Sequence, residues 1–108
     1  MTNYMARPGI QYPDAKLTLL KNFICEQMRV KSVDFECKKR TRNLVLARQI
    51  FFYLASKSGK MVAIGKYLGK HHSTVIHSRN QIENLLSYKS EESDLINDVI
   101  EKHKILFA

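Results

Sequence analysis

Apolar residues recur along this chain at the three- and four-residue steps of helix faces, and no segment alternates in the way of a half-buried strand. This spacing predicts a helix over residues 14–28 and a short one over residues 30–37. In residues 44–55, where Asn43 is the expected N-cap, ten of twelve residues are apolar. A helix that is apolar nearly all round must be surrounded by other helices, so we expect residues 44–55 to form the centre of the domain.

Residues 61–86 have the pattern of two helices separated by a tight turn at Gly69. In the first helix, four positions share one inward face: Met61, Ile64, Gly65 and Leu68. In the second, the apolar and small residues gather on one side: Val75, Ser78, Ile82, Leu85 and Leu86. The opposite side is polar and consists of Ser73, His77, Asn80 and Asn84. One side anchors the helix and the other is free to contact another molecule, which is typical of a helix-turn-helix.

A last helix is predicted after residues 87–90, with Ser90 or Ser93 as its N-cap and acidic residues in its first turn. Its apolar positions are Leu95, Ile96, Val99, Ile100 and Ile105. The whole pattern predicts an all-α domain of about six helices over residues 14–108. Residues 1–13 hold two prolines and a glycine among polar residues, so we expect a flexible N-terminal arm there.

Charge is unevenly distributed along the sequence. The chain carries a formal net charge of +8 and has a pI near 9.7. Residues 29–49 and 50–81 contribute +5 each, residues 1–28 contribute +1 and residues 82–108 contribute −3. Residues 50–81 contain no Asp or Glu at all. A helix-turn-helix inside a purely basic segment is expected to meet DNA, and the KKRTR run at residues 38–42 is a further candidate for phosphate or groove contacts.

The cysteines and the apolar runs indicate where the protein is found. Cys25 and Cys37 are the only cysteines and belong to no CxxC pair or zinc-finger spacing. We expect both to be reduced, buried packing residues of a cytosolic protein. A disulfide between them is the alternative hypothesis. Residues 1–13 lack the apolar segment of a signal peptide, and the longest apolar run, residues 50–55, is too short to cross a bilayer. The expected location is therefore the cytoplasm, in association with the nucleoid.

Other kinds of chemistry have little support in the sequence. His71, His72 and His77 are adjacent or five to six residues apart, which is not the four-residue spacing that places two metal ligands on one helix face. The segment GKYLGK is similar to a phosphate-binding loop, but it has three intervening residues where four are needed and falls within a helical pattern. We therefore predict no metal, no cofactor and no enzymatic activity.

Two segments are similar to a known family. KKRTRNLVLARQIFFYLA at residues 38–55 resembles the basic loop and central helix of the C-terminal DNA-binding domain, domain IV, of the bacterial chromosomal replication initiator DnaA. IGKYLGKHHSTVIHS at residues 64–78 resembles the signature segment at the start of that family's recognition helix. Their order and spacing agree with the family over about residues 17–106. The resemblance implies a Trp-repressor-like helix-turn-helix domain that binds double-stranded DNA.

The resemblance also assigns roles to particular residues. Arg40 matches the arginine that the family inserts into the minor groove, where negative potential is concentrated. Arg48 and Gln49 match a polar pair that lies against the DNA. His72 and Ser73 match residues that enter the major groove. These five residues form the centre of the predicted DNA-binding site.

The complete set of predicted DNA-binding residues adds the surrounding basic and polar positions. It comprises Lys38, Lys39, Arg40, Arg42, Arg48, Gln49, Lys70, His71, His72, Ser73, Thr74 and His77. Thr74 matches a phosphate-contacting position of the family. His71 stands where the family usually has an aspartate that reads a base, so a hydrogen-bond acceptor has become a possible donor. Leu46 and Ala47 replace an Arg-Pro pair, which removes one charge beside the minor groove.

These observations predict sequence-specific binding of double-stranded DNA, similar to box recognition by the replication initiator but without its ATPase. The expected role is regulation of replication initiation or of transcription, with a phage or mobile element as one source of the protein. The alternative is a protein-protein interaction module that binds replication proteins through the acidic last helix or the N-terminal arm. RNA or single-strand binding is a third hypothesis, for which the usual aromatic platform is missing.

Overall fold

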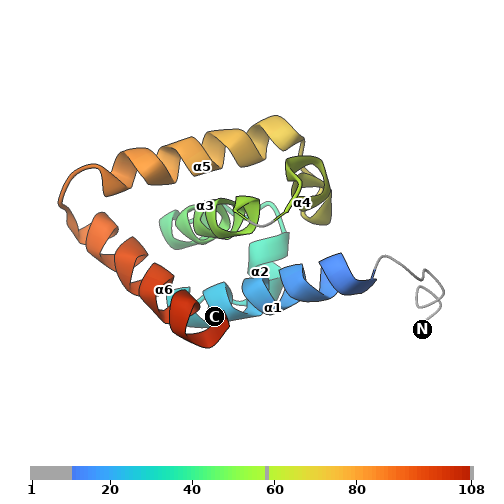
Figure 1. Cartoon of the computed structure of the whole chain (residues 1–108), viewed down its shortest axis with the longest axis horizontal. Helices are drawn as coiled ribbons and strands as arrows, with labels where there is room; N and C mark the ends of the chain where they lie inside the picture. Colours follow the sequence, from blue (N-terminus) through green and yellow to red (C-terminus); the bar gives the residue numbers. More distant parts are fainter. Residues whose placement is uncertain (1–10, 58, 108) are drawn as a thin grey trace.

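The helix α3 (Arg42–Ser56) lies at the centre of the structure, a computed structural model that describes residues 11–57 and 59–107 (Figure 1). It packs against the helices on both sides of it, and its buried residues are Leu44, Leu46, Ala47, Ile50, Phe51, Phe52, Tyr53, Leu54 and Ala55. The predicted central apolar helix is therefore confirmed. Its start differs from the prediction, because the side-chain oxygen of Thr41 accepts a hydrogen bond from the backbone N–H of Leu44 at 3.3 Å. Thr41, and not Asn43, is the N-cap.

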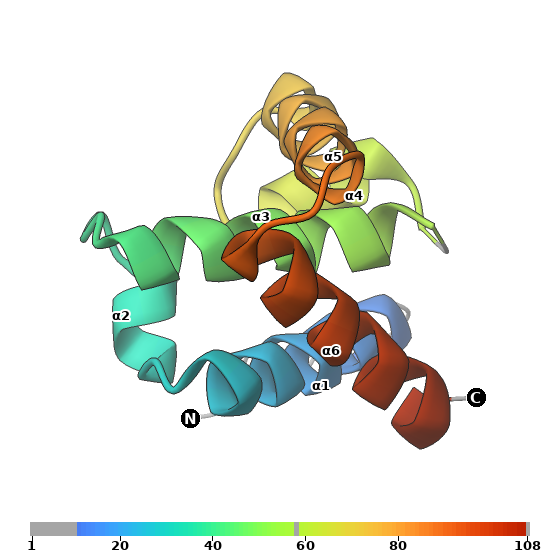
Figure 2. The same ribbon diagram turned by 90° about the vertical axis from the view of Figure 1, so that its left-hand side faces the viewer.

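Two helices, α1 (Gln11–Met28) and α2 (Ser32–Glu36), precede α3. Figure 2 shows α1 on the opposite side of α3 from α5, with α2 connecting α1 to α3. Phe35 of α2 packs edge-on against Phe51 of α3, with 5.6 Å between the ring centroids. α1 begins three residues before its predicted start, so residues 11–13 of the expected arm are helical. The remainder of that arm, residues 1–10, lies outside the described residues.

The helices α4 (Met61–Tyr67) and α5 (His72–Leu86) form the predicted helix-turn-helix and cover the other side of α3 (Figure 2). Gly69, between them, has a φ of +69°, a conformation in which glycine is unstrained. Gly65 is buried in α4, where a Cβ atom would lie 2.6 Å from the carbonyl oxygen of Lys70. The backbone N–H of Lys70 donates to the carbonyl of Gly65 at 2.8 Å. Gly65 therefore lets the chain turn back tightly against α4, which determines where α5 begins.

The helix α6 (Glu91–Phe107) runs from the end of α5 towards α1 (Figure 1). Ser90 and Ser93 cap it reciprocally: the N–H of Ser93 donates to Oγ of Ser90 at 3.1 Å, and the N–H of Ser90 donates to Oγ of Ser93 at 2.9 Å. Ile96 is fully buried, but Leu95 and Ile105 are 37% and 77% exposed. Two of the five apolar positions predicted for this helix, Leu95 and Ile105, therefore do not face the core, because α6 packs against its neighbours over only a narrow face.

The described residues contain six α-helices and no strand, which confirms the predicted all-α fold. Cys25 is buried, and this burial raises the pKa of its thiol. Cys37 is exposed at the end of α2, so its predicted burial is wrong, and both thiols are free. No helix in the described part of the chain combines the length and the apolar character that crossing a bilayer requires.

Candidate nucleic-acid interface

The turn between α4 and α5 and the first turn of α5 form an exposed polar surface. His71 is the N-cap of α5, and its Nδ1 accepts a hydrogen bond from the backbone N–H of Ser73 at 3.2 Å. The ring of His72 lies against that of His71, with 4.2 Å between the centroids. His71, His72 and Ser73 are exposed, and Thr74 is half-buried. Such a helix start can offer backbone N–H groups and polar side chains to a phosphate or a base edge.

The opposite side of α5 anchors this surface to the core. Val75 and Ile82 are completely buried and Ser78 is nearly so, whereas His77 and Asn80 are exposed. The predicted division of α5 into an anchoring side and a free side is confirmed. Because α5 packs along α3, the first turn of α5 has a fixed direction relative to the rest of the domain.

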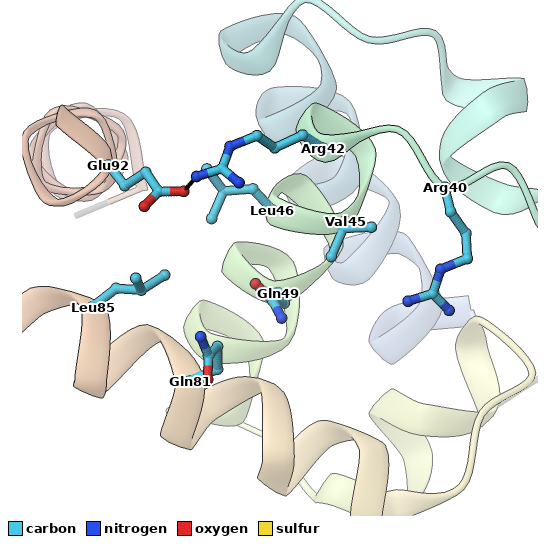
Figure 3. Close-up of a pocket in the computed structure, with 8 residues that line it drawn as sticks. All are labelled: Arg40, Arg42, Val45, Leu46, Gln49, Gln81, Leu85 and Glu92. Atoms are coloured by element: carbon cyan, nitrogen blue, oxygen red, sulfur yellow. Dashed lines mark hydrogen bonds and ion pairs between the residues drawn. The ribbon is translucent and has the colours of Figure 1, made fainter.

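The loop between α2 and α3 supplies the basic part of the surface. Lys38, Lys39 and Arg40 in this loop are all exposed. Figure 2 shows the loop and the α4–α5 turn towards the left-hand side of the view, on one side of the molecule. Arg40 also lines an open groove of about 560 Å³ between α3, α5 and α6 (Figure 3). The groove residues are Arg40, Arg42, Val45, Leu46, Gln49, Gln81, Leu85 and Glu92.

Arg40 and Arg42 point in different directions from the two sides of this groove (Figure 3). Arg42, the first residue of α3, forms an ion pair with Glu92 in the first turn of α6. Arg40 lies at the opposite end of the groove from Glu92 and forms no ion pair with any residue that the structure describes. The guanidinium of Arg40 is therefore available to a partner, whereas that of Arg42 already has one.

Arg48 is directed into the protein. Its Nε donates to the carbonyl oxygen of Phe35, and its Nη2 donates to the carbonyls of Asp34 and Cys37, all at 2.9 Å. These carbonyls lie at the end of α2, which has only five residues and no basic residue in its last turn. Arg48 therefore holds α2 and the start of the basic loop against α3, a role that the sequence reasoning missed. The available signal was a short acidic helix whose terminal carbonyls have no local donor.

The structure divides the twelve predicted DNA-binding residues by exposure. Nine are exposed: Lys38, Lys39, Arg40, Arg42, Lys70, His71, His72, Ser73 and His77. Three are partly buried: Arg48, Gln49 and Thr74. Gln49 lies in the groove with Gln81 of α5. Within the described ranges, no group of three His, Cys, Asp or Glu side chains is placed to hold a metal ion.

A tightly turned helix pair, an exposed polar start to its second helix and a neighbouring basic loop together define a helix-turn-helix DNA-binding domain. The family model described as the bacterial DnaA protein helix-turn-helix matches residues 18–82. The chain belongs to this family, as the resemblance of residues 38–55 and 64–78 predicted.

Similar proteins are chromosomal replication initiator proteins DnaA from several bacteria. The protein from a Thermoanaerobacter species is 34% identical over 88 residues, which cover 80% of this chain and 19% of the relative. The Caldanaerobacter subterraneus protein is 38% identical over 77 residues, 69% of this chain and 17% of the relative. The protein from a Wolbachia species is 39% identical over 79 residues, 70% of this chain and 17% of the relative. The chain thus spans about a fifth of the length of these curated relatives.

Proposed function

We propose that this domain binds double-stranded DNA at a specific sequence similar to the initiator's binding box. His71, His72 and Ser73 enter the major groove with the first turn of α5, and Arg40 enters the adjacent minor groove. The observation that carries the proposal is the exposure of His72 and Ser73 at the start of α5 and of Arg40 in the loop between α2 and α3, since this loop and the α4–α5 turn lie on the same side of the domain (Figure 2). One duplex can occupy both positions only when they share a side.

The surrounding residues position the domain on the phosphate backbone in this proposal. They are Lys38, Lys39, Arg42, Lys70, Thr74 and His77, and Gln49 lies in the adjoining groove. Arg48 supports the surface by holding the basic loop in place. If about five or six phosphates are contacted, the logarithm of affinity should fall with the logarithm of salt concentration at a slope of about −5. A slope near zero would contradict the electrostatic part of the proposal.

The proposed biological role is regulation of replication initiation or of transcription. It follows from membership of a family whose relatives are named replication initiators. The printed sequence contains no nucleotide-binding motif, so we propose that this chain itself is not an enzyme and acts by occupying initiator boxes or recruiting other proteins to them. A bacterial nucleoid is the proposed location, with either a host or a phage or mobile element as the source.

Selection from a random duplex library tests the proposed binding. We expect enrichment of one short sequence, which then serves as the probe for variants. Arg40→Ala and His72→Ala should each weaken binding to it by about 1 to 3 kcal/mol, because each removes a groove contact. Lys104→Ala is a matched control, since Lys104 is an exposed lysine on the distant end of α6. No enrichment, or wild-type affinity in both site variants, would overturn the proposal.

The alternative function, a protein-protein interaction module for replication proteins, is favoured by one observation. Ile105, Leu106 and Phe107 at the end of α6 are 77%, 66% and 43% exposed, and duplex binding uses none of them. Titration with duplex DNA at moderate salt separates the two functions. Absence of duplex binding, combined with capture of a replication protein that Leu106→Ser abolishes, would favour the alternative.

A further inference from the structure

The cap of α5 determines which ring nitrogen of His71 carries the hydrogen. The backbone N–H of Ser73 can only donate, and it donates to Nδ1 of His71 at 3.2 Å. Oγ of Ser73 lies 3.0 Å from the same nitrogen. An accepting Nδ1 must be unprotonated, so the neutral imidazole keeps its hydrogen on Nε2. The cap thus leaves Nε2 as a donor on an exposed side chain.

This donor stands where a helix-turn-helix reads base edges, at the N-terminal end of its second helix. In the major groove, guanine shows N7 and O6 as acceptors, adenine shows N7 and thymine shows O4, whereas cytosine shows only its N4 amino donor. An N–H donor can pair with the first three bases but not with cytosine. The ring of His72, 4.2 Å away, packs against His71 and restricts the direction in which Nε2–H points.

We propose that His71 is a specificity-determining residue that selects a base with a major-groove acceptor and rejects cytosine. Two observations carry this inference: the hydrogen bond that caps α5 through Nδ1, and the exposure of the same ring. It rests on the proposed function, since it requires that the start of α5 enters the major groove. Its effect is confined to the one base pair that faces His71.

Two substitutions separate the cap from the base contact. Asparagine and aspartate are both favourable N-cap residues, so His71→Asn and His71→Asp should unfold at nearly the same temperature as the wild type. The Asn variant caps through its amide oxygen and keeps an N–H donor. The Asp variant offers only acceptors. Only His71→Asp therefore replaces the hydrogen-bond donor that faces the major groove with an acceptor.

The experiment measures the affinity of each protein for the selected duplex and for all its single-base-pair substitutions. At one position, wild type and His71→Asn should prefer an acceptor base over cytosine by about 5- to 100-fold. His71→Asp should prefer cytosine at that same position. Identical preferences in wild type and His71→Asp, in proteins that both select a site, would overturn this inference and leave the proposed function standing. Failure of the wild type to select any duplex would overturn both.

Nitrogen NMR of the free protein tests the inference without DNA. The spectrum of the neutral form of His71 should show the hydrogen on Nε2. A hydrogen on Nδ1 in the wild type would overturn the inference even if the protein binds a duplex.

Discussion

Arg48 of α3 and Phe35 of α2 are joined by a hydrogen bond, in which Nε of Arg48 donates to the carbonyl oxygen of Phe35 at 2.9 Å. The same guanidinium donates to the carbonyls of Asp34 and Cys37, so one side chain satisfies three acceptors around the end of α2. Charge-assisted bonds of this kind are among the stronger polar interactions in proteins. The basic loop that follows Cys37 is therefore held to the core by a residue that the sequence suggested as a DNA contact.

We predict that Arg48→Ala lowers the free energy of unfolding by about 1 to 3 kcal/mol, because it leaves carbonyls at the end of α2 without their donor. Urea unfolding of the variant and the wild type measures this loss.

Arg48→Lys is the informative control, since lysine keeps the charge but cannot reproduce the guanidinium geometry. If Arg48 holds α2 and the basic loop against α3, its bracing role, then Arg48→Lys should lose most of the stability that Arg48→Ala loses. Unchanged stability in both variants, with weaker DNA binding and a shallower salt dependence for Arg48→Ala, would contradict the bracing role and favour a direct DNA contact.

A second prediction concerns the close approach at Gly65. Gly65→Ala places a Cβ atom 2.6 Å from the carbonyl oxygen of Lys70, a backbone atom of the turn before α5. We expect a stability loss of about 1 to 3 kcal/mol from this overpacking, although alanine is normally the better helix former. Thermal unfolding measures the loss, and weaker duplex binding should accompany it because the start of α5 must move.

Gly69→Asn is the matched control for Gly65→Ala. Nothing lies within 4 Å of a Cβ atom at Gly69, and asparagine tolerates its positive φ better than most residues. Gly69→Asn should therefore be the milder change. A Gly65→Ala protein as stable as the control would show that the turn can relax around the new methyl group.

A third prediction concerns the ion pair between Arg42 and Glu92. The side chain of Arg42 is 77% exposed and that of Glu92 is 31% exposed, so breaking the pair should change stability by less than about 1 kcal/mol. Glu92→Gln should nevertheless increase duplex affinity about two- to fivefold, because Arg42 no longer has to leave a carboxylate to contact a phosphate. Equilibrium binding at moderate salt measures the increase.

Glu91→Gln removes the same charge from the adjacent residue without touching this ion pair. Equal gains in affinity for Glu91→Gln and Glu92→Gln would mean that general charge, and not release of Arg42, is responsible.

A fourth prediction follows from the aromatic cluster at the end of α6. The ring of His103 stacks on Phe107 with 4.8 Å between centroids and lies 6.0 Å from the ring of Phe23. Burial among these groups lowers the pKa of His103 below its ordinary value of 6.5. Below pH 6.5 the unfolded chain binds a proton at His103 more readily than the native protein does. The contribution of His103 to stability is therefore complete above that pH and is lost as the pH falls through its lowered native pKa.

His103→Phe keeps an aromatic ring at this position and removes the group that binds the proton. The free energy of unfolding, measured in urea between about pH 8 and pH 5, should decline less steeply in His103→Phe than in wild type. The contributions of the other histidines cancel in this comparison. Parallel pH profiles for the two proteins would contradict the prediction.

The accuracy of the sequence predictions depended on how local each feature is. Gly69 and Ser90 marked a turn and a cap correctly because each acts on neighbouring backbone. The exposure of Ile105 was missed, since a regular apolar spacing on α6 does not reveal whether another helix lies opposite. Thr41, and not the predicted Asn43, caps α3. Threonine and asparagine are both favourable N-cap residues, so the path of the loop decides which side chain reaches a free backbone N–H.

The sequence by itself determined the order of the helices, the buried side of α5 and the basic character of residues 29–81, because helix periodicity, turn residues and formal charge are local properties. Only the tertiary structure decided what the three arginines of residues 40–48 contact. Arg48 donates to the carbonyls at the end of α2, Arg42 pairs with a glutamate fifty residues further along, and Arg40 is exposed at the end of the groove opposite that glutamate. These contacts depend on distances between segments that are remote in the sequence. Helix packing sets those distances, and they cannot be derived from residue spacing along the chain.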